Sequence, residues 1–161
     1  EIDVLRWLLS EDYATAEVRY GKSTNNGPKD LHDPQIMILT TKSGVRIDVE
    51  SFVNNHNDYD IKCEIVCDGA VLNMPKPNYI SVNANATTGQ AMYTDCFQRF
   101  ADAYNDEIQA WINASKEGRV DGPTAWDGYA CQVAAAAASK ARETQTIVDV
   151  VYDPMPDFYK D

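Results

Sequence analysis

Beyond the first ten residues, the period of the apolar residues changes once, near residue 95, and this change limits the folds available to the chain. Before that point apolar and polar residues alternate, most clearly in VRIDVE at residues 45–50, a spacing typical of a strand with one buried face. After it, apolar residues recur every three or four positions between residues 97 and 112, which indicates a helix. Strands followed by helices predict an α+β fold, with an open, largely antiparallel sheet and helices packed on one face.

The same patterns predict the individual elements. Helical spacing of apolar residues predicts a helix over residues 2–9 and another over residues 95–116. A third helix is expected to begin at Thr124, with Asp127 as the acidic residue of a capping box. Strands are predicted over residues 16–20, 35–41, 45–53, 59–66, 70–74 and 79–83. Loops are predicted over residues 21–34 and 83–90, which are rich in turn-forming residues.

The length and charge of the chain exclude several classes of partner. A chain of 161 residues is long enough for one domain, residues 1–161, that buries about 70% of the surface its unfolded form would expose. Its 14 basic and 25 acidic residues give a net charge of -11, which repels phosphate backbones and anionic lipids. We therefore expect no nucleic acid and no membrane as a partner. The lack of a bilayer-length apolar run and of a signal-peptide pattern favours the cytoplasm.

The cysteines predict neither a disulfide nor a metal site. Cys63 and Cys67 lie in an alternating segment, where a strand would hold their α-carbons about 13 Å apart, beyond the reach of a disulfide or a shared zinc ion. Cys96 and Cys131 fall in helical patterns, where a buried thiol usually acts as a small apolar side chain. A zinc or redox protein is therefore a poor interpretation of this sequence.

The chain displays no complete catalytic motif. Its eight glycines form neither a G-x-G-x-x-G motif nor a phosphate-binding loop. His32 is expected to be a surface residue of a loop. His56, among amides and an acid at the end of a strand, is the better candidate for a general base, although no partner that would orient it is visible in the sequence. These residues alone predict an acidic α+β domain without a self-contained active site.

Four segments taken together resemble a known family. They are EIDVLRWLL at residues 1–9, DYDIKCEIV at 58–66, FADAYNDEIQAW at 100–111 and GPTAWDGYA at 122–130. In this order and at these separations they resemble the C-terminal domain of the glucose-fructose and inositol oxidoreductase family (Gfo/Idh/MocA), most of all its bacterial inositol 2-dehydrogenase branch. The resemblance extends from Glu1 to about Val150.

The resemblance implies that the catalytic groups lie outside this chain. In the family a catalytic His immediately precedes the EIDVL segment and a catalytic Asp lies four residues before that His, so both are expected just upstream of Glu1. The nucleotide-binding Rossmann domain and a catalytic Lys in a Glu-Lys-Pro segment are expected further upstream. Lys76 and Pro77 imitate that lysine motif within a predicted loop, and we interpret them as a coincidence.

The resemblance also implies a substrate and a set of binding residues. Members of this branch resemble NAD-dependent alcohol dehydrogenases that pass a hydride from a cyclic polyol to the nicotinamide. By position, Asp3, Tyr59 and Tyr104 match residues that contact the polyol, and carboxylates and phenols can bind hydroxyl groups. The alternative is that Tyr59 and Tyr104 are ordinary core aromatics.

Two departures from the family pattern affect the expected pocket. This chain has Asn57 where close relatives have an aromatic residue, and Cys96 where they have Trp. Both differences remove ring surface, so we count Asn57 and Cys96 among the substrate-binding candidates and expect an altered preference among inositols or related sugars.

Two functional hypotheses remain open from the sequence. The first is the substrate-binding and oligomerisation domain of an NAD-dependent polyol dehydrogenase, inactive by itself and assembled as a homodimer or homotetramer through its sheet. The charged face of residues 46–50 would then meet a neighbouring copy. The second is a free-standing binding or regulatory module with the same fold.

Overall fold

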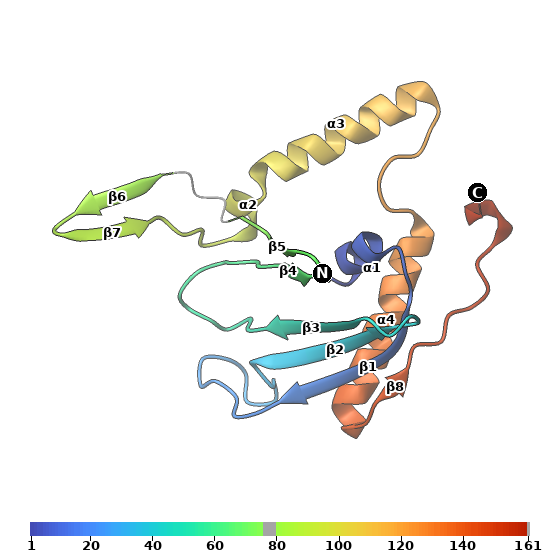
Figure 1. The fold of residues 1–161 in the computed structure, drawn as a ribbon, viewed down its shortest axis with the longest axis horizontal. Coiled ribbons are helices and arrows are strands. Elements are labelled where there is room, and N and C mark those ends of the chain that lie inside the picture. The colour runs from blue at the N-terminus through green and yellow to red at the C-terminus, as the bar shows by residue number, and fades with distance from the viewer. Residues whose placement is uncertain (76–79, 161) are drawn as a thin grey trace. The chain divides into compact units, whose positions relative to one another are not determined.

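The computed structural model describes residues 1–75 and 80–160. Contacts between α-carbons divide the chain into two compact units (Figure 1). Unit 1 comprises Glu1–Asn55 and Gly122–Asp161, and unit 2 comprises His56–Asp121. Lys76 and Pro77, the imitation of the lysine motif, lie outside the described residues.

Unit 1 is built on a four-stranded sheet. Its strands are β1 (Tyr13–Tyr20), β2 (Gln35–Thr41), β3 (Arg46–Ser51) and β8 (Val148–Asp149). They run in the order β3-β2-β1-β8 with every pairing antiparallel. The open, antiparallel sheet predicted from the sequence is therefore confirmed, and the helix α4 (Ala125–Thr144) packs against β1.

The pairing register gives the sheet one apolar and one charged face. Ala16 pairs with Leu39, and Leu39 pairs with Ile47, so side chains of three strands meet on the face that α4 covers. Along β3 the exposed residues alternate with half-buried ones, beginning with exposed Arg46. The predicted alternation in VRIDVE thus describes a strand with one covered face.

Alanines let α4 approach this sheet closely. Ala134, Ala137 and Ala138 are buried in the same cluster as Leu39, and a row of such small side chains lets the helix backbone lie near the strands. The helix begins as predicted, because the Thr124 side chain accepts a hydrogen bond from the Asp127 backbone and the Asp127 side chain accepts one from the Thr124 backbone. This capping box fixes where α4 starts.

The helix α1 (Ile2–Leu9) has the predicted bounds and packs on α4. It ends at Ser10, whose backbone is left-handed with φ of 51° and whose N–H bonds back into the last turn. Glu1, at the start of the helix, makes no side-chain cap. The half-buried residues of α1 include Asp3 and Arg6, which make the polar contacts described below.

Unit 2 consists of two strand pairs and two helices. The antiparallel pairs are β4 (Glu64–Val66) with β5 (Val71–Asn73) and β6 (Ser81–Ala84) with β7 (Thr87–Gln90). The helices are α2 (Cys96–Arg99) and α3 (Ala101–Glu117). Among the residues described in this unit, Ala114 is the one buried side chain.

Several predicted bounds in unit 2 were wrong. The strand predicted over residues 59–66 forms only at Glu64–Val66. Residues 83–90, predicted as a loop, instead complete a hairpin. They contain the end of β6, a turn at Asn85 and Ala86, and the strand β7, and both turn residues adopt positive φ, of 53° and 58°. The predicted helix over residues 95–116 is interrupted at Phe100. Tyr79, the first residue of another predicted strand, lies outside the described residues.

A buried carboxylate anchors the loop between β1 and β2. Asp33 is only 3% exposed, and its side chain accepts hydrogen bonds from the backbone of Val53 and from the backbone and side chain of Asn54. These bonds outweigh the effect of burial and lower the pKa of Asp33. The predicted loop over residues 21–34 is therefore tied to the segment that follows β3.

Candidate functional site

The five predicted substrate-binding residues fall in both units. Asp3 belongs to unit 1, whereas Asn57, Tyr59, Cys96 and Tyr104 belong to unit 2. The two groups are described separately.

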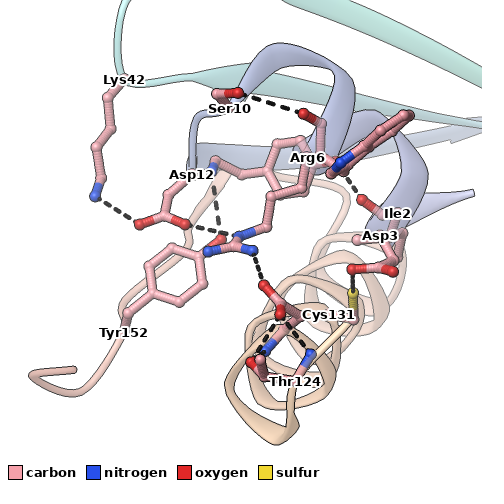
Figure 2. A network of polar contacts seen from close by, with 12 residues as sticks. Ile2, Asp3, Arg6, Ser10, Asp12, Lys42, Thr124, Cys131 and Tyr152 are labelled. Atoms are coloured by element: carbon pink, nitrogen blue, oxygen red, sulfur yellow. Dashed lines mark hydrogen bonds and ion pairs between the residues drawn. The ribbon is translucent and has the colours of Figure 1, made fainter. Parts of the chain in front are cut away.

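Asp3 lies on α1 and faces α4. Its Oδ1 atom accepts a hydrogen bond from Cys131 Sγ at 3.7 Å (Figure 2). Burial raises the pKa of the Cys131 thiol, and the neighbouring carboxylate of Asp3 raises it further. The thiol is therefore protonated at neutral pH and able to donate to Asp3.

Three further hydrogen bonds hold α1 in place. The hydroxyl of Tyr13, on β1, donates to the backbone oxygen of Ile2 at 2.6 Å. Arg6 donates from Nε to Asp12 at 2.8 Å and from Nη1 to Asp127 at 2.6 Å (Figure 2). Because Asp127 also caps α4, Arg6 connects α1 directly to the start of that helix.

This ion network is largely shielded from water. The Arg6 side chain is 15% exposed. Burial alone would lower the pKa of Arg6, but its hydrogen bonds to Asp12 and Asp127 outweigh this effect and raise it. Burial alone would raise the pKa of both carboxyl groups. Hydrogen bonds from Arg6 and Lys42 nevertheless hold the pKa of Asp12 below its usual range, and those from Thr124 and Arg6 do the same for Asp127. Arg6, Asp12 and Asp127 are therefore all charged near neutral pH.

Three of the four candidates in unit 2 lie close together. Partial burial raises the pKa of Tyr104, and the adjacent side chains of Cys96 and Tyr59 raise it further. The ring of Tyr59 also meets the ring of Phe100 edge to face, with centroids 6.3 Å apart. The Tyr59 backbone N–H donates to the Tyr93 oxygen at 2.8 Å, which fixes its segment against the chain that leads into α2.

The tyrosines of this cluster are only partly enclosed. Tyr104 is 44% exposed and Tyr59 is half-buried, so within unit 2 neither is an ordinary core aromatic. Asn57 is exposed and stands two residues before Tyr59 on the same irregular segment. The cluster thus presents two phenols and a thiol on an accessible surface, where each can exchange hydrogen bonds with a hydroxylated ligand.

Neither histidine enters these groups. His32 is exposed, and its ring stacks on that of Tyr20 at 3.7 Å. Both rings line an open hollow of about 640 Å³ that also includes Arg142 and Glu143. His56 is exposed.

The residues whose contacts hold α1 against the rest of unit 1 were not singled out from the sequence. Cys131 was interpreted as a small apolar side chain, and Arg6 and Asp12 carried no motif. The signal that could have identified them is the helical spacing that places Arg6 on the face of Asp3, one turn further along α1.

The described residues contain no cluster suited to a metal ion and no membrane-spanning helix. No group of three or more His, Cys, Asp or Glu side chains in this part of the chain could hold a metal. The helices described here include none with the length and apolar character needed to cross a bilayer. All four cysteines are free thiols.

Comparison with known families decides where this domain belongs. The model of the Gfo/Idh/MocA "oxidoreductase family, C-terminal alpha/beta domain" matches residues 1–150. The chain belongs to this family. The match includes both units and confirms the resemblance found in the four sequence segments.

Curated relatives from this family are named inositol 2-dehydrogenases. The proteins from Klebsiella pneumoniae and Burkholderia cenocepacia are 46% and 44% identical to this chain over 160 residues, which is 99% of it and 48% of each relative. The chain therefore spans about half the length of the curated relatives that it matches.

Solved structures agree with this assignment. Myo-inositol dehydrogenase from Lactobacillus casei, solved with NAD(H) and myo-inositol, is 32% identical, with a TM-score of 0.92 over 99% of this chain and 48% of that one. The ligand-free structure of scyllo-inositol dehydrogenase from the same organism shares the fold at 23% identity. Its TM-score is 0.84 over 92% of this chain and 46% of that one.

Proposed function

We propose that this chain is the substrate-binding and oligomerisation domain of an NAD-dependent dehydrogenase that oxidises an inositol-type cyclic polyol. The observation that carries this proposal is the 46% identity to an inositol 2-dehydrogenase over 99% of the chain. Identity at this level along the whole domain supports a shared substrate class as well as a shared fold.

The side chains in both candidate groups support a polyol ligand. In unit 1, Asp3 offers a carboxylate that can accept hydrogen bonds from hydroxyl groups. In unit 2, Tyr59 and Tyr104 offer phenols that can both donate and accept. We propose that each of these residues contacts the polyol, and that Asn57 and Cys96 shape the pocket near the two tyrosines.

The residues of this chain do not fit a nicotinamide dinucleotide. Such cofactors bind where a parallel strand turns through a glycine-rich loop into a helix. The described strands pair only in antiparallel fashion, and the glycines of the sequence form no such loop. We therefore assign NAD binding to a part of the enzyme outside this chain, and we expect the chain alone to be inactive.

The proposal is tested on the product of the complete gene. The coding frame ahead of Glu1 should continue into a glycine-rich βαβ segment, a Glu-Lys-Pro and an Asp-x-x-x-His that ends at Glu1. The purified full-length product should reduce NAD when it is supplied with an inositol. A start codon directly ahead of Glu1, or a full-length product inactive on every inositol, would favour the free-standing binding module instead.

The identity of the polyol is tested by restoring the missing rings. Asn57→Tyr together with Cys96→Trp adds aromatic surface near Tyr59 and Tyr104, and a contact of this kind changes discrimination between similar substrates about 10-fold or more. We expect relative kcat/KM to shift toward myo-inositol in the full-length enzyme. Gln109→Ala, on the exposed surface of α3, is the control that should leave the ranking unchanged. An unchanged ranking in the double variant would contradict the assigned roles of Asn57 and Cys96.

We also propose that the charged face of the sheet in unit 1 meets another copy of the enzyme. The exposed residues Arg46, Asp48 and Glu50 of β3 lie on the face opposite the core. Sedimentation of the full-length product should give a dimer or tetramer, and only monomer at high concentration would contradict this.

The four free thiols support a cytoplasmic location, because that compartment keeps thiols reduced.

A further inference from the structure

The contact between Asp3 and Cys131 has a geometry that is useful for binding. Only the Oδ1 atom of Asp3 receives the thiol, at 3.7 Å. Within the part of the chain that the structure describes, Asp3 takes part in no ion pair. A carboxylate has two oxygens with about four acceptor positions, so most of the hydrogen-bonding capacity of Asp3 is left for a ligand.

Both partners of this contact lie on elements that are held firmly. Cys131 follows Ala130, which is fully buried, on a helix whose start is fixed by the capping box. Asp3 lies on α1, which the hydroxyl of Tyr13 and the guanidinium of Arg6 hold in place (Figure 2). A hydrogen bond between two such elements restricts the rotation of the carboxylate.

We propose that Cys131 is a positioning residue for Asp3, holding Oδ1 so that Oδ2 is presented to a hydroxyl group of the substrate. This inference rests on the proposed function, in which Asp3 contacts the polyol. A thiol is a weak donor, so it orients the carboxylate without competing strongly for the lone pairs that the polyol would use.

The alternative role for Cys131 is packing alone, as a small apolar side chain. The two roles differ in whether the effect of removing the thiol depends on Asp3. A positioning effect disappears when Asp3 is absent, whereas a packing effect persists. A double-mutant cycle between the two residues therefore separates them.

The first test is kinetic and uses the full-length enzyme. Cys131→Ala should raise KM for the inositol about threefold, the size expected for one weak hydrogen bond, with little change in kcat. In an Asp3→Ala background, the same substitution should have no further effect on KM. Val133→Ala removes a partly buried side chain of α4 that packs against the core, and as the structural control it should leave KM unchanged.

The second test measures the contact without any catalysis. Asp3→Asn removes a negative charge beside the thiol, which should lower the pKa of Cys131 and speed its alkylation by iodoacetamide about twofold or more at neutral pH. Mass spectrometry of the peptide that contains Cys131 gives its rate separately from those of the other cysteines. The titratable or charged side chains of this chain that face the thiol are Asp3, Arg6, Tyr13 and Tyr152. Glu11→Gln removes a carboxylate outside this group and serves as the control.

The two tests distinguish failure of this inference from failure of the proposed function. If the wild-type enzyme oxidises inositol but Cys131→Ala has the wild-type KM, or the same effect with and without Asp3, the positioning role is overturned and the function stands. If Asp3→Asn leaves the alkylation rate of Cys131 unchanged, the contact itself is overturned. If the wild-type enzyme oxidises no inositol, the proposed function fails and the positioning role fails with it.

Discussion

The two units of this chain differ sharply in how they bury their side chains. Unit 1 has a continuous core in which Tyr13, Ala16 and Leu39 are fully buried beneath α4. In unit 2, Ala114 is the one buried side chain among the described residues, while Phe97, Ile108 and Trp111 are 74%, 57% and 63% exposed. Unit 1 can be stabilised by its own apolar packing, whereas unit 2 presents apolar surface to its surroundings.

Under the proposed function, unit 1 supplies most of the stability of the domain, and unit 2 supplies most of the candidate binding side chains. The tyrosine and cysteine side chains of unit 2 lie on an accessible surface, where a ligand or another protein can reach them. The carboxylate of Asp3, in contrast, lies among the anchoring contacts of unit 1. We therefore expect substitutions in unit 1 to change the free energy of unfolding strongly. Matched substitutions in unit 2 should change it little.

The largest effect is expected from the core of unit 1. Leu39→Ala removes a fully buried side chain and should lower the free energy of unfolding by about 2–5 kcal/mol, measured by urea denaturation. Leu72→Ala, at a residue of unit 2 that is 56% exposed, should change it by less than about 0.5 kcal/mol. Equal losses from the two variants would show that unit 2 also depends on apolar packing.

A second pair of variants compares two arginines that each bridge two carboxylates. Arg6 reaches Asp12 and Asp127 with a side chain that is 15% exposed, whereas Arg119 reaches Glu117 and Asp121 with one that is 50% exposed. Arg6→Met leaves two shielded carboxylates without this partner and should lower the free energy of unfolding by about 1–3 kcal/mol. Arg119→Met should leave the thermal midpoint unchanged, because exposed ion pairs contribute little.

The contribution of Arg6 should also depend on pH. The folded protein holds the pKa of Asp12 and Asp127 below their usual range, so their stabilising effect is complete above about pH 4, the pKa of an unfolded aspartate. It is lost as the pH falls through the lower values of the folded state. The difference in stability between wild type and Arg6→Met should therefore shrink below about pH 4. A constant difference down to the acid transition would exclude this linkage.

The smallest effect is expected from the helix caps. Thr124→Ala removes the cap of the 20-residue helix α4 and should lower the free energy of unfolding by about 1 kcal/mol. Asp95→Ala removes the cap of the four-residue helix α2, where Asp95 accepts from the Gln98 backbone, and a smaller loss is expected there. A larger loss from Asp95→Ala would reverse the comparison between the units.

Local patterns were sufficient to predict most of unit 1. The bounds of α1 and β2 and the capping box at Thr124 agree with the structure, because each depends on residues close together in the sequence. The short strand β8 was missed, since its two residues pair with β1 from far along the chain. The anchoring role of Asp33 was missed for the same reason, because its partners lie about 20 residues away.

The irregular parts of unit 2 were harder to predict. The segment from Tyr59 to Lys62 alternates like a strand, but the structure gives it no ladder partner and Tyr59 bonds to Tyr93 instead. The turn at Asn85 and Ala86 was hidden because alanine rarely adopts positive φ. The proximity of Tyr59, Cys96 and Tyr104 arises from tertiary folding, and the family resemblance indicated these residues without showing that they meet.

The two roles of Asp127 set a limit on how this domain can be redesigned. One carboxylate both caps α4 and receives Arg6, so an engineer who exchanges the first turn of α4 for that of a relative also changes the support of α1. Asparagine at this position could still satisfy the cap, but it would remove one of the two counter-charges of the Arg6 guanidinium and leave Asp12 as the other. Residues 6 and 127 should therefore be transplanted together, as one unit of sequence, when chimeric enzymes are made from members of this family.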